Sequence, residues 1–183
     1  MQQKLDVSIL VPRALRESAD YGALTAKQRE GLTARLLHAH ELIDAAVEAA
    51  NASGEAQRQA VLDLELDAMT IISVVGEPEK AVSAWLVHSS WTFECSDRRL
   101  ADYIDPAALR VASAPKLALE ASSDDVSRWL RGWSEALQST FRKLSAAKTF
   151  CEAIAQLVAI DMLTAAMLTS IALLHVSGHL KRQ

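Results

Sequence analysis

The stretch from Phe150 to Val176, FCEAIAQLVAIDMLTAAMLTSIALLHV, decides the fold class because it carries only two formal charges, Glu152 and Asp161. A helix with so little polar surface must be covered by other parts of the protein or by a membrane. Its uncharged part, Met162 to Val176, has 15 residues, fewer than the roughly 20 that span a bilayer. A longer window includes Asp161, whose unfavourable free energy of membrane insertion largely offsets the favourable contribution of the apolar residues. We expect a buried central helix. The less favoured alternatives are a membrane-associated segment and an exposed oligomer face.

The composition around this stretch favours an all-α protein. Aromatic residues make up only 5% of the chain, which has six Gly and four Pro among 183 residues, and alanine and leucine favour helices. A chain of this length fits one domain, residues 1–183. We therefore expect a single-domain helical bundle of about five main helices with antiparallel neighbours and short helical pieces.

Three of these helices are expected before the middle of the chain. Thr25 and Gln28 match a capping box and predict a helix from about 26 to 51. A second helix is expected from about 55 to 75, and a third from Pro78 to near Cys95. Apolar residues of the first helix alternate spacings of four and three, which indicates one narrow packing seam. This seam is Leu32, Leu36, Ala39, Ile43, Ala46 and Ala50.

Two segments are expected to be less regular. Residues 1–24 should form an N-terminal arm and a short helix that begins at Pro12. Residues 96–123 should form an irregular connection with short helical pieces, because Asp105-Pro106 and Pro115 interrupt the pattern.

The remaining helix precedes the apolar stretch. Ser123, Asp124 and Asp125 are expected to cap it. Thr149 and Glu152 match another capping box, so a new helix should begin there although no Gly or Pro forces a break. The helix capped by Ser123 is amphipathic, and its apolar side chains share one face. They are Val126, Trp129, Leu130, Trp133, Leu137, Phe141 and Leu144.

Charge and cysteine content bear on partners and location. The formal charge of −4 argues against nucleic-acid binding, which rests on clustered Lys and Arg. Cys95 and Cys151 have no metal-site spacing, so reduced cysteines in an intracellular compartment are the simpler interpretation, and a disulfide is the alternative. The N-terminus does not resemble a signal peptide. We expect a cytoplasmic protein.

Asp161 is the most informative single residue of the apolar helix. It lies about 180° around the helix from Glu152 and Ser170, so it should face the core, where an unpaired carboxylate is costly or becomes protonated. An ion pair with an Arg or a hydrogen bond from an indole is the favoured interpretation, and a ligand-binding or proton-transfer site is the alternative. The wetter stripe should consist of Glu152, Gln156, Ser170 and Ser177.

Histidine and tryptophan supply the other candidates. His38 and His40 lie close to Glu41 and Asp44, but the two histidines point about 160° apart on a helix, so no single metal ion could use both. We assign no metal and no cofactor, and these carboxylates suit a solvated face.

Three of the four tryptophans, Trp85, Trp129 and Trp133, fall on core stripes. Trp91 points away from its helix's apolar face and is a candidate for partner contact. His88 lies beside serines but lacks the context of a nucleophile elbow.

These patterns favour a non-enzymatic protein–protein interaction module of the adaptor, chaperone, inhibitor or regulator type, and we expect it to form a homodimer. One alternative is a bundle that binds a small apolar or lipid-like ligand near Asp161. A second is an enzyme that uses Asp161 or His88 as acid or base. No catalytic residue is assigned, and the candidate ligand or partner contacts are Asp161, Trp91, His88 and Trp133.

Overall fold

The computed structural model describes residues 10–57, 59–61, 63–64, 100–113 and 122–176. These residues form helices and no strand, which confirms the all-α fold class. Residues 54–57, 59–61 and 63–64 are also helical. The bounded elements are α1 (Arg13–Arg16), α2 (Ala19–Ala23), α3 (Ala26–Asn51), the 3-10 helix η2 (Leu100–Tyr103), α6 (Pro106–Ser113), α7 (Ser123–Ser145) and α8 (Phe150–Val176).

Helix α3 has the predicted bounds because its capping box forms. The Thr25 hydroxyl accepts a hydrogen bond from the Gln28 amide at 3.2 Å, and the Gln28 side chain accepts one from the Thr25 amide at 2.9 Å. Together they satisfy two amides that lack partners within the helix. All six residues of the predicted seam, Leu32 to Ala50, are buried.

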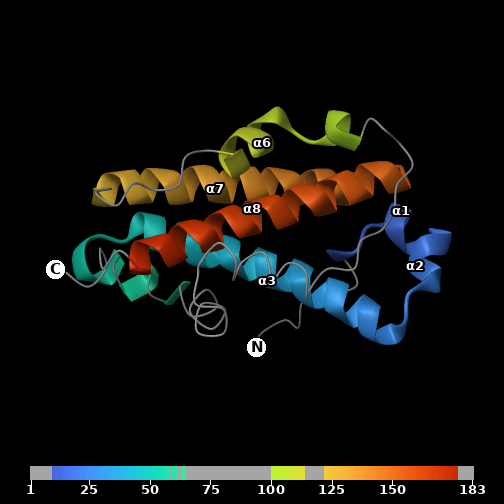
Figure 1. Cartoon of the computed structure of the whole chain (residues 1–183), viewed down its shortest axis with the longest axis horizontal. Coiled ribbons are helices and arrows are strands. Elements are labelled where there is room, and N and C mark those ends of the chain that lie inside the picture. Colours follow the sequence, from blue (N-terminus) through green and yellow to red (C-terminus); the bar gives the residue numbers. More distant parts are fainter. Residues whose placement is uncertain (1–9, 58, 62, 65–99, 114–121, 177–183) are drawn as a thin grey trace.

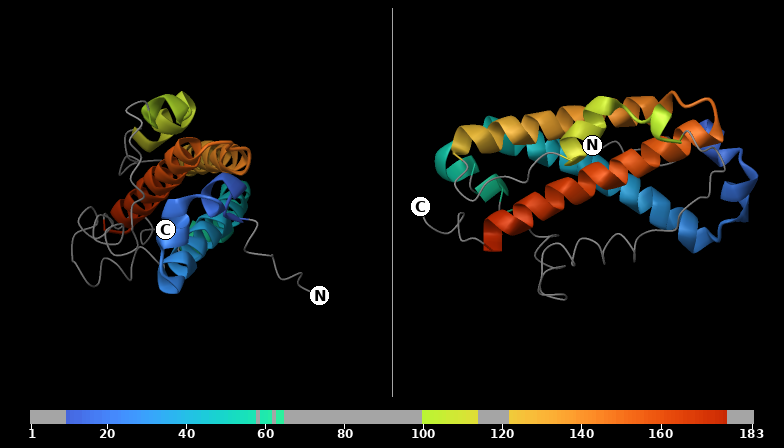
Figure 2. Two further views of the ribbon diagram at one scale, coloured as in Figure 1. Left: turned by 90° about the vertical axis from the view of Figure 1, so that its right-hand side faces the viewer. Right: turned by 45° about the horizontal axis from the view of Figure 1, so that its top comes forward.

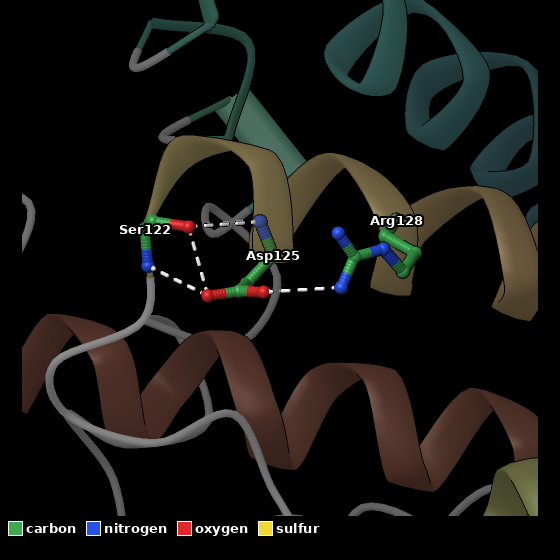
Figure 3. A network of polar contacts seen from close by, with 3 residues as sticks. All are labelled: Ser122, Asp125 and Arg128. Atoms are coloured by element: carbon green, nitrogen blue, oxygen red, sulfur yellow. Dashed lines mark hydrogen bonds and ion pairs between the residues drawn. The ribbon is translucent and has the colours of Figure 1, made fainter.

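Helix α7 begins at Ser123, so its cap lies one residue before the predicted one. Its N-cap is Ser122 and not Ser123. The Ser122 hydroxyl accepts from the Asp125 amide at 3.2 Å, while the Asp125 carboxylate accepts from the Ser122 amide at 3.3 Å (Figure 3). A capping box needs the acid three residues after the cap, and Asp125 stands at that distance from Ser122. On the apolar face of α7, Trp129 and Phe141 are only partly buried, and the other five residues are buried.

The predicted break between α7 and α8 is present. The Thr149 hydroxyl accepts a hydrogen bond from the Glu152 amide at 3.2 Å. The Glu152 carboxylate accepts one from the Lys148 amide at 2.8 Å. Side-chain capping therefore starts the new helix without a Gly or Pro.

Helix α7 lies between the other two long helices in the packing. Helix α7 contacts both α3 and α8, while α6 and η2 also contact α8. Figure 1 shows α7 and α8 side by side along the molecule, with α6 over them on the side away from α3, and the end view of Figure 2 agrees. The centre of the core holds fully buried side chains from α7 and α8, among them Trp133, Leu137, Leu163 and Met167.

The wetter stripe predicted for α8 is wrong at two of its positions. Gln156 and Ser170 are buried, with 4% and 3% of their surface exposed. The Gln156 side-chain amide donates to the Tyr103 carbonyl at 2.7 Å, so η2 covers this side of α8. Ser177 lies outside the described residues.

The connection before α7 is fastened by Asp105. Its carboxylate accepts from the Lys143 ammonium of α7 at 2.6 Å and from the Ala107 amide at 2.8 Å. These hydrogen bonds, first that of Lys143, hold the pKa of Asp105 below its ordinary value. Short helices η2 and α6 confirm the predicted helical pieces within 96–123.

Cysteine chemistry differs from the expectation, because Cys151 in the first turn of α8 is disulfide-bonded. The sequence has one other cysteine, Cys95, which lies outside the described residues. The pattern could not reveal this bond, since pairing depends on distance in the fold and not on spacing in sequence.

Several predictions fall outside the described part of the chain. They are the extended arm before residue 10, the end of the helix expected to reach about 75, and the helix from Pro78 to Cys95 with Trp85, His88 and Trp91.

Candidate interaction surface

Asp161 of α8 forms an ion pair with Arg35 of α3. The two residues are 126 positions apart in sequence, so the pair joins two helices that the chain does not connect directly. The Arg35 side chain is 14% exposed and that of Asp161 is 35% exposed. Asp161 therefore lies at the edge of the core, and the prediction that it faces the driest side is wrong. The reason is that α7, α6 and η2 cover other sides of α8.

The environment of Asp161 acts on its pKa in two opposing ways. Burial raises the pKa, and the charge and hydrogen bond of Arg35 lower it. Burial has the larger effect, so the pKa is raised above its ordinary value. The favoured interpretation from sequence, a structural partner for this carboxylate, agrees with the Arg35 contact.

Trp133 has a structural role. Its side chain is fully buried, and the indole N–H donates to the Leu163 carbonyl of α8 at 2.6 Å. A buried indole needs such an acceptor. The predicted core position of Trp133 is confirmed, and the hydrogen bond ties α7 to the middle of α8.

The side of α8 that faces away from the core is mostly apolar. Two rows of residues along it, spaced one turn apart, are at least partly exposed: Leu157, Asp161 and Ala165, and Val158, Met162 and Ala166. Val158 and Met162 are each 37% exposed. We call these six residues the α8 outward face. The residues that alternate with these positions along the sequence, Ala159, Ile160, Leu163 and Thr164, lie on the other side of the helix and are buried.

The sequence pattern did not indicate which side of α8 is exposed. Polar residues were expected to mark the wetter side, whereas the exposed positions include a valine and a methionine. The sequence did indicate the extent of the problem, because a helix this long and apolar has more apolar surface than its neighbours cover.

The length and composition of α8 also fit a membrane span. Among the described helices, Phe150–Met167 has a mean hydropathy of 1.5, and 56% of that window is buried in the fold. A core helix of a soluble protein meets the same test, so length and composition are weak evidence for a membrane segment.

A polar hollow of about 620 Å³ lies elsewhere, between the end of α3 and the first half of α7. Two acids and two arginines of α7 line it, Asp124, Glu135, Arg128 and Arg131, so their formal charges cancel. The Arg131 guanidinium donates to the Ala50 carbonyl at 3.1 Å and thereby caps the end of α3.

Beside this hollow, buried Gln57 makes three polar contacts. Its amide donates to the Ala49 carbonyl at 3.1 Å and to the Ser127 hydroxyl at 2.5 Å. It also accepts a hydrogen bond from the Ser123 hydroxyl. Several polar groups around the hollow thus hold α3 against α7, and Asp161 is not part of its lining.

The histidines of α3 do not form a metal centre with the acids near them. In the part of the chain that the structure describes, no three His, Cys, Asp or Glu side chains are grouped so that they could hold a metal ion. The His40 ring instead packs edge-on against Phe141, with 5.6 Å between ring centres.

In comparisons with known proteins, no family model, no curated protein and no solved structure matches this chain.

Proposed function

We propose that the protein is a non-enzymatic helical interaction module that binds a protein partner through the α8 outward face. The observation that carries this proposal is the exposure of Val158 and Met162, 37% each, one turn apart on α8, the most apolar of the described helices. Apolar side chains gathered on a surface mark sites of association more often than isolated ones do. Leu157 and the two alanines extend the apolar surface on both sides.

Two observations favour this function over a ligand pocket or an enzyme centred on Asp161. The carboxylate is engaged by Arg35, so its oxygens are not free to contact a ligand or a substrate. The hollow between α3 and α7 is lined mainly by polar and charged groups and lies away from Asp161, whereas an apolar ligand needs an apolar pocket.

A protein partner is also favoured over a membrane. The Arg35–Asp161 ion pair stands within the apolar surface, and charged groups are costly in the hydrocarbon region. Full insertion would also separate α8 from α7 and break the Trp133 hydrogen bond to Leu163.

Site-specific photo-crosslinking in the producing cell tests the proposal. A photoreactive amino acid at Met162 is expected to give discrete adducts with protein, and the same group at exposed Arg142 on α7 serves as the control. Adding Val158→Asp should remove the Met162 adducts, because a charge in an apolar contact is penalised. Equal adducts at both positions, or adducts with lipid alone, would contradict the proposed function.

A further inference from the structure

We infer that the partner of the α8 outward face is a second copy of this chain, with the two α8 helices antiparallel about a two-fold axis that passes between Asp161 and Met162. This inference rests on the proposed function and names its partner. It also specifies which residue of one copy meets which residue of the other.

The exposed positions are symmetric about that axis. In an antiparallel pair, Leu157 faces Ala166 of the second copy and Val158 faces Ala165, because each pair is equally far from the axis. The two larger side chains stand at one end of the face and the two alanines at the other. Each bulky residue therefore meets a small one, which is the complementarity that close helix packing requires.

The spacing of the rows suits a helix crossing. Leu157, Asp161 and Ala165 form a ridge of residues four apart, and Val158, Met162 and Ala166 form the next. When ridges of this kind from two helices interdigitate, the axes cross at about −50°. The alanines allow the backbones to approach closely. The flexible side chain of Met162, which lies near the axis, can adjust its conformation to the surface of the second copy.

The charges on this face also permit self-association. Asp161 lies beside the axis, where an unpaired carboxylate would oppose contact between two copies. Each copy supplies its own Arg35 to that carboxylate, so both charges enter the contact already paired. The second copy therefore does not have to supply a positive charge to neutralise Asp161.

The contact is small, since it consists of one face of one helix from each copy. Interfaces below about 1,200 Å² are typical of weak or transient complexes. We therefore expect a reversible monomer–dimer equilibrium with a dissociation constant on the order of micromolar or weaker.

Analytical ultracentrifugation of the full chain, from about 5 to about 500 μM, tests the inference through two single substitutions and their combination. Val158→Arg and Ala165→Glu should each weaken dimerisation at least about tenfold, because each places a lone charge against an apolar side chain. The double variant should recover to within about threefold of wild type, since the introduced charges face each other twice across the axis. Far-UV circular dichroism shows whether each variant is folded.

If Val158→Arg does not fold, Val158→Asn takes its place as a neutral variant that should also weaken the dimer. A wild-type chain that stays monomeric at the highest concentration would overturn the inference. So would a dimer that is unaffected by the folded Val158 variant, or a double variant that recovers no affinity. A monomeric chain that still crosslinks a different protein from Met162 would overturn the second copy as partner and leave the proposed function intact.

Discussion

At the scale of single residues, Asp161 connects the sequence to the tertiary structure. Its position in an apolar helix predicts that the carboxylate needs a partner, and Arg35 of α3 is that partner. The chain offers many arginines, so the sequence alone could not choose among them. Trp133 shows the converse, because its core position follows from helical spacing while its acceptor, the Leu163 carbonyl, required the structure.

The raised pKa of Asp161 predicts a pH dependence of stability. The folded protein holds the proton of the Asp161 carboxyl more tightly than the unfolded chain does. The contribution of this protonation to stability is therefore complete below the ordinary pKa of 3.8, and it is lost as the pH rises through the folded-state pKa. Asp161→Asn removes this titration and keeps an oxygen that can accept from Arg35. We expect the unfolding free energy of the variant, relative to wild type, to increase as the pH rises from about 3 to about 7.

Urea unfolding followed by circular dichroism at a series of pH values measures this difference. Asp105→Asn is the matched control, because the lowered pKa of Asp105 gives the opposite sign: its stabilising contribution is present above the ordinary pKa and lost at lower pH. A relative stability of Asp161→Asn that is flat or falls with rising pH would show that the carboxyl does not titrate as described.

At the scale of helices, local capping was the most informative part of the sequence. The Thr25–Gln28 box placed the start of α3 at the correct residue, and Thr149 did the same for α8. The start of α7 was predicted one residue late, because three adjacent residues, Ser122, Ser123 and Asp124, can all cap a helix. Only the distance to Asp125 distinguishes Ser122.

The capping of α7 predicts a measurable loss of stability. Ser122→Ala removes the acceptor for the Asp125 amide (Figure 3) and should lower the free energy of unfolding by about 1 kcal/mol. Ser145→Ala, at the exposed last residue of α7, should change it by less than about 0.5 kcal/mol. Urea unfolding of both variants provides the comparison, and equal effects would show that Ser122 does not cap the helix.

At the scale of the whole molecule, the disulfide at Cys151 contradicts the prediction of reduced cysteines. Disulfide bonds are typical of oxidising compartments, so the cysteines no longer support a reducing compartment. The cytoplasmic location stays a prediction from the N-terminal sequence. The bond begins in the first turn of α8, so it constrains the helix that most of the fold packs against.

Reduction of this bond should destabilise the protein by about 2–4 kcal/mol, because the unfolded chain regains conformational freedom. Thermal unfolding with and without reductant measures the effect, and Cys151→Ser should melt at the same temperature under both conditions. Mass spectrometry of the denatured protein after maleimide treatment gives an independent measurement. Labelling of Cys151 without prior reduction would contradict the disulfide.

The sequence by itself determined the helical class, the bounds of α3 and the core face of α7, because capping and helical periodicity act over a few neighbouring residues. The tertiary structure alone decided which side of α8 is outward. That helix is apolar on nearly every side, so its pattern carries no direction, and the sides covered by α7, α6 and η2 leave Val158 and Met162 exposed. The Arg35–Asp161 pair likewise depends on the fold, since 126 positions separate its members.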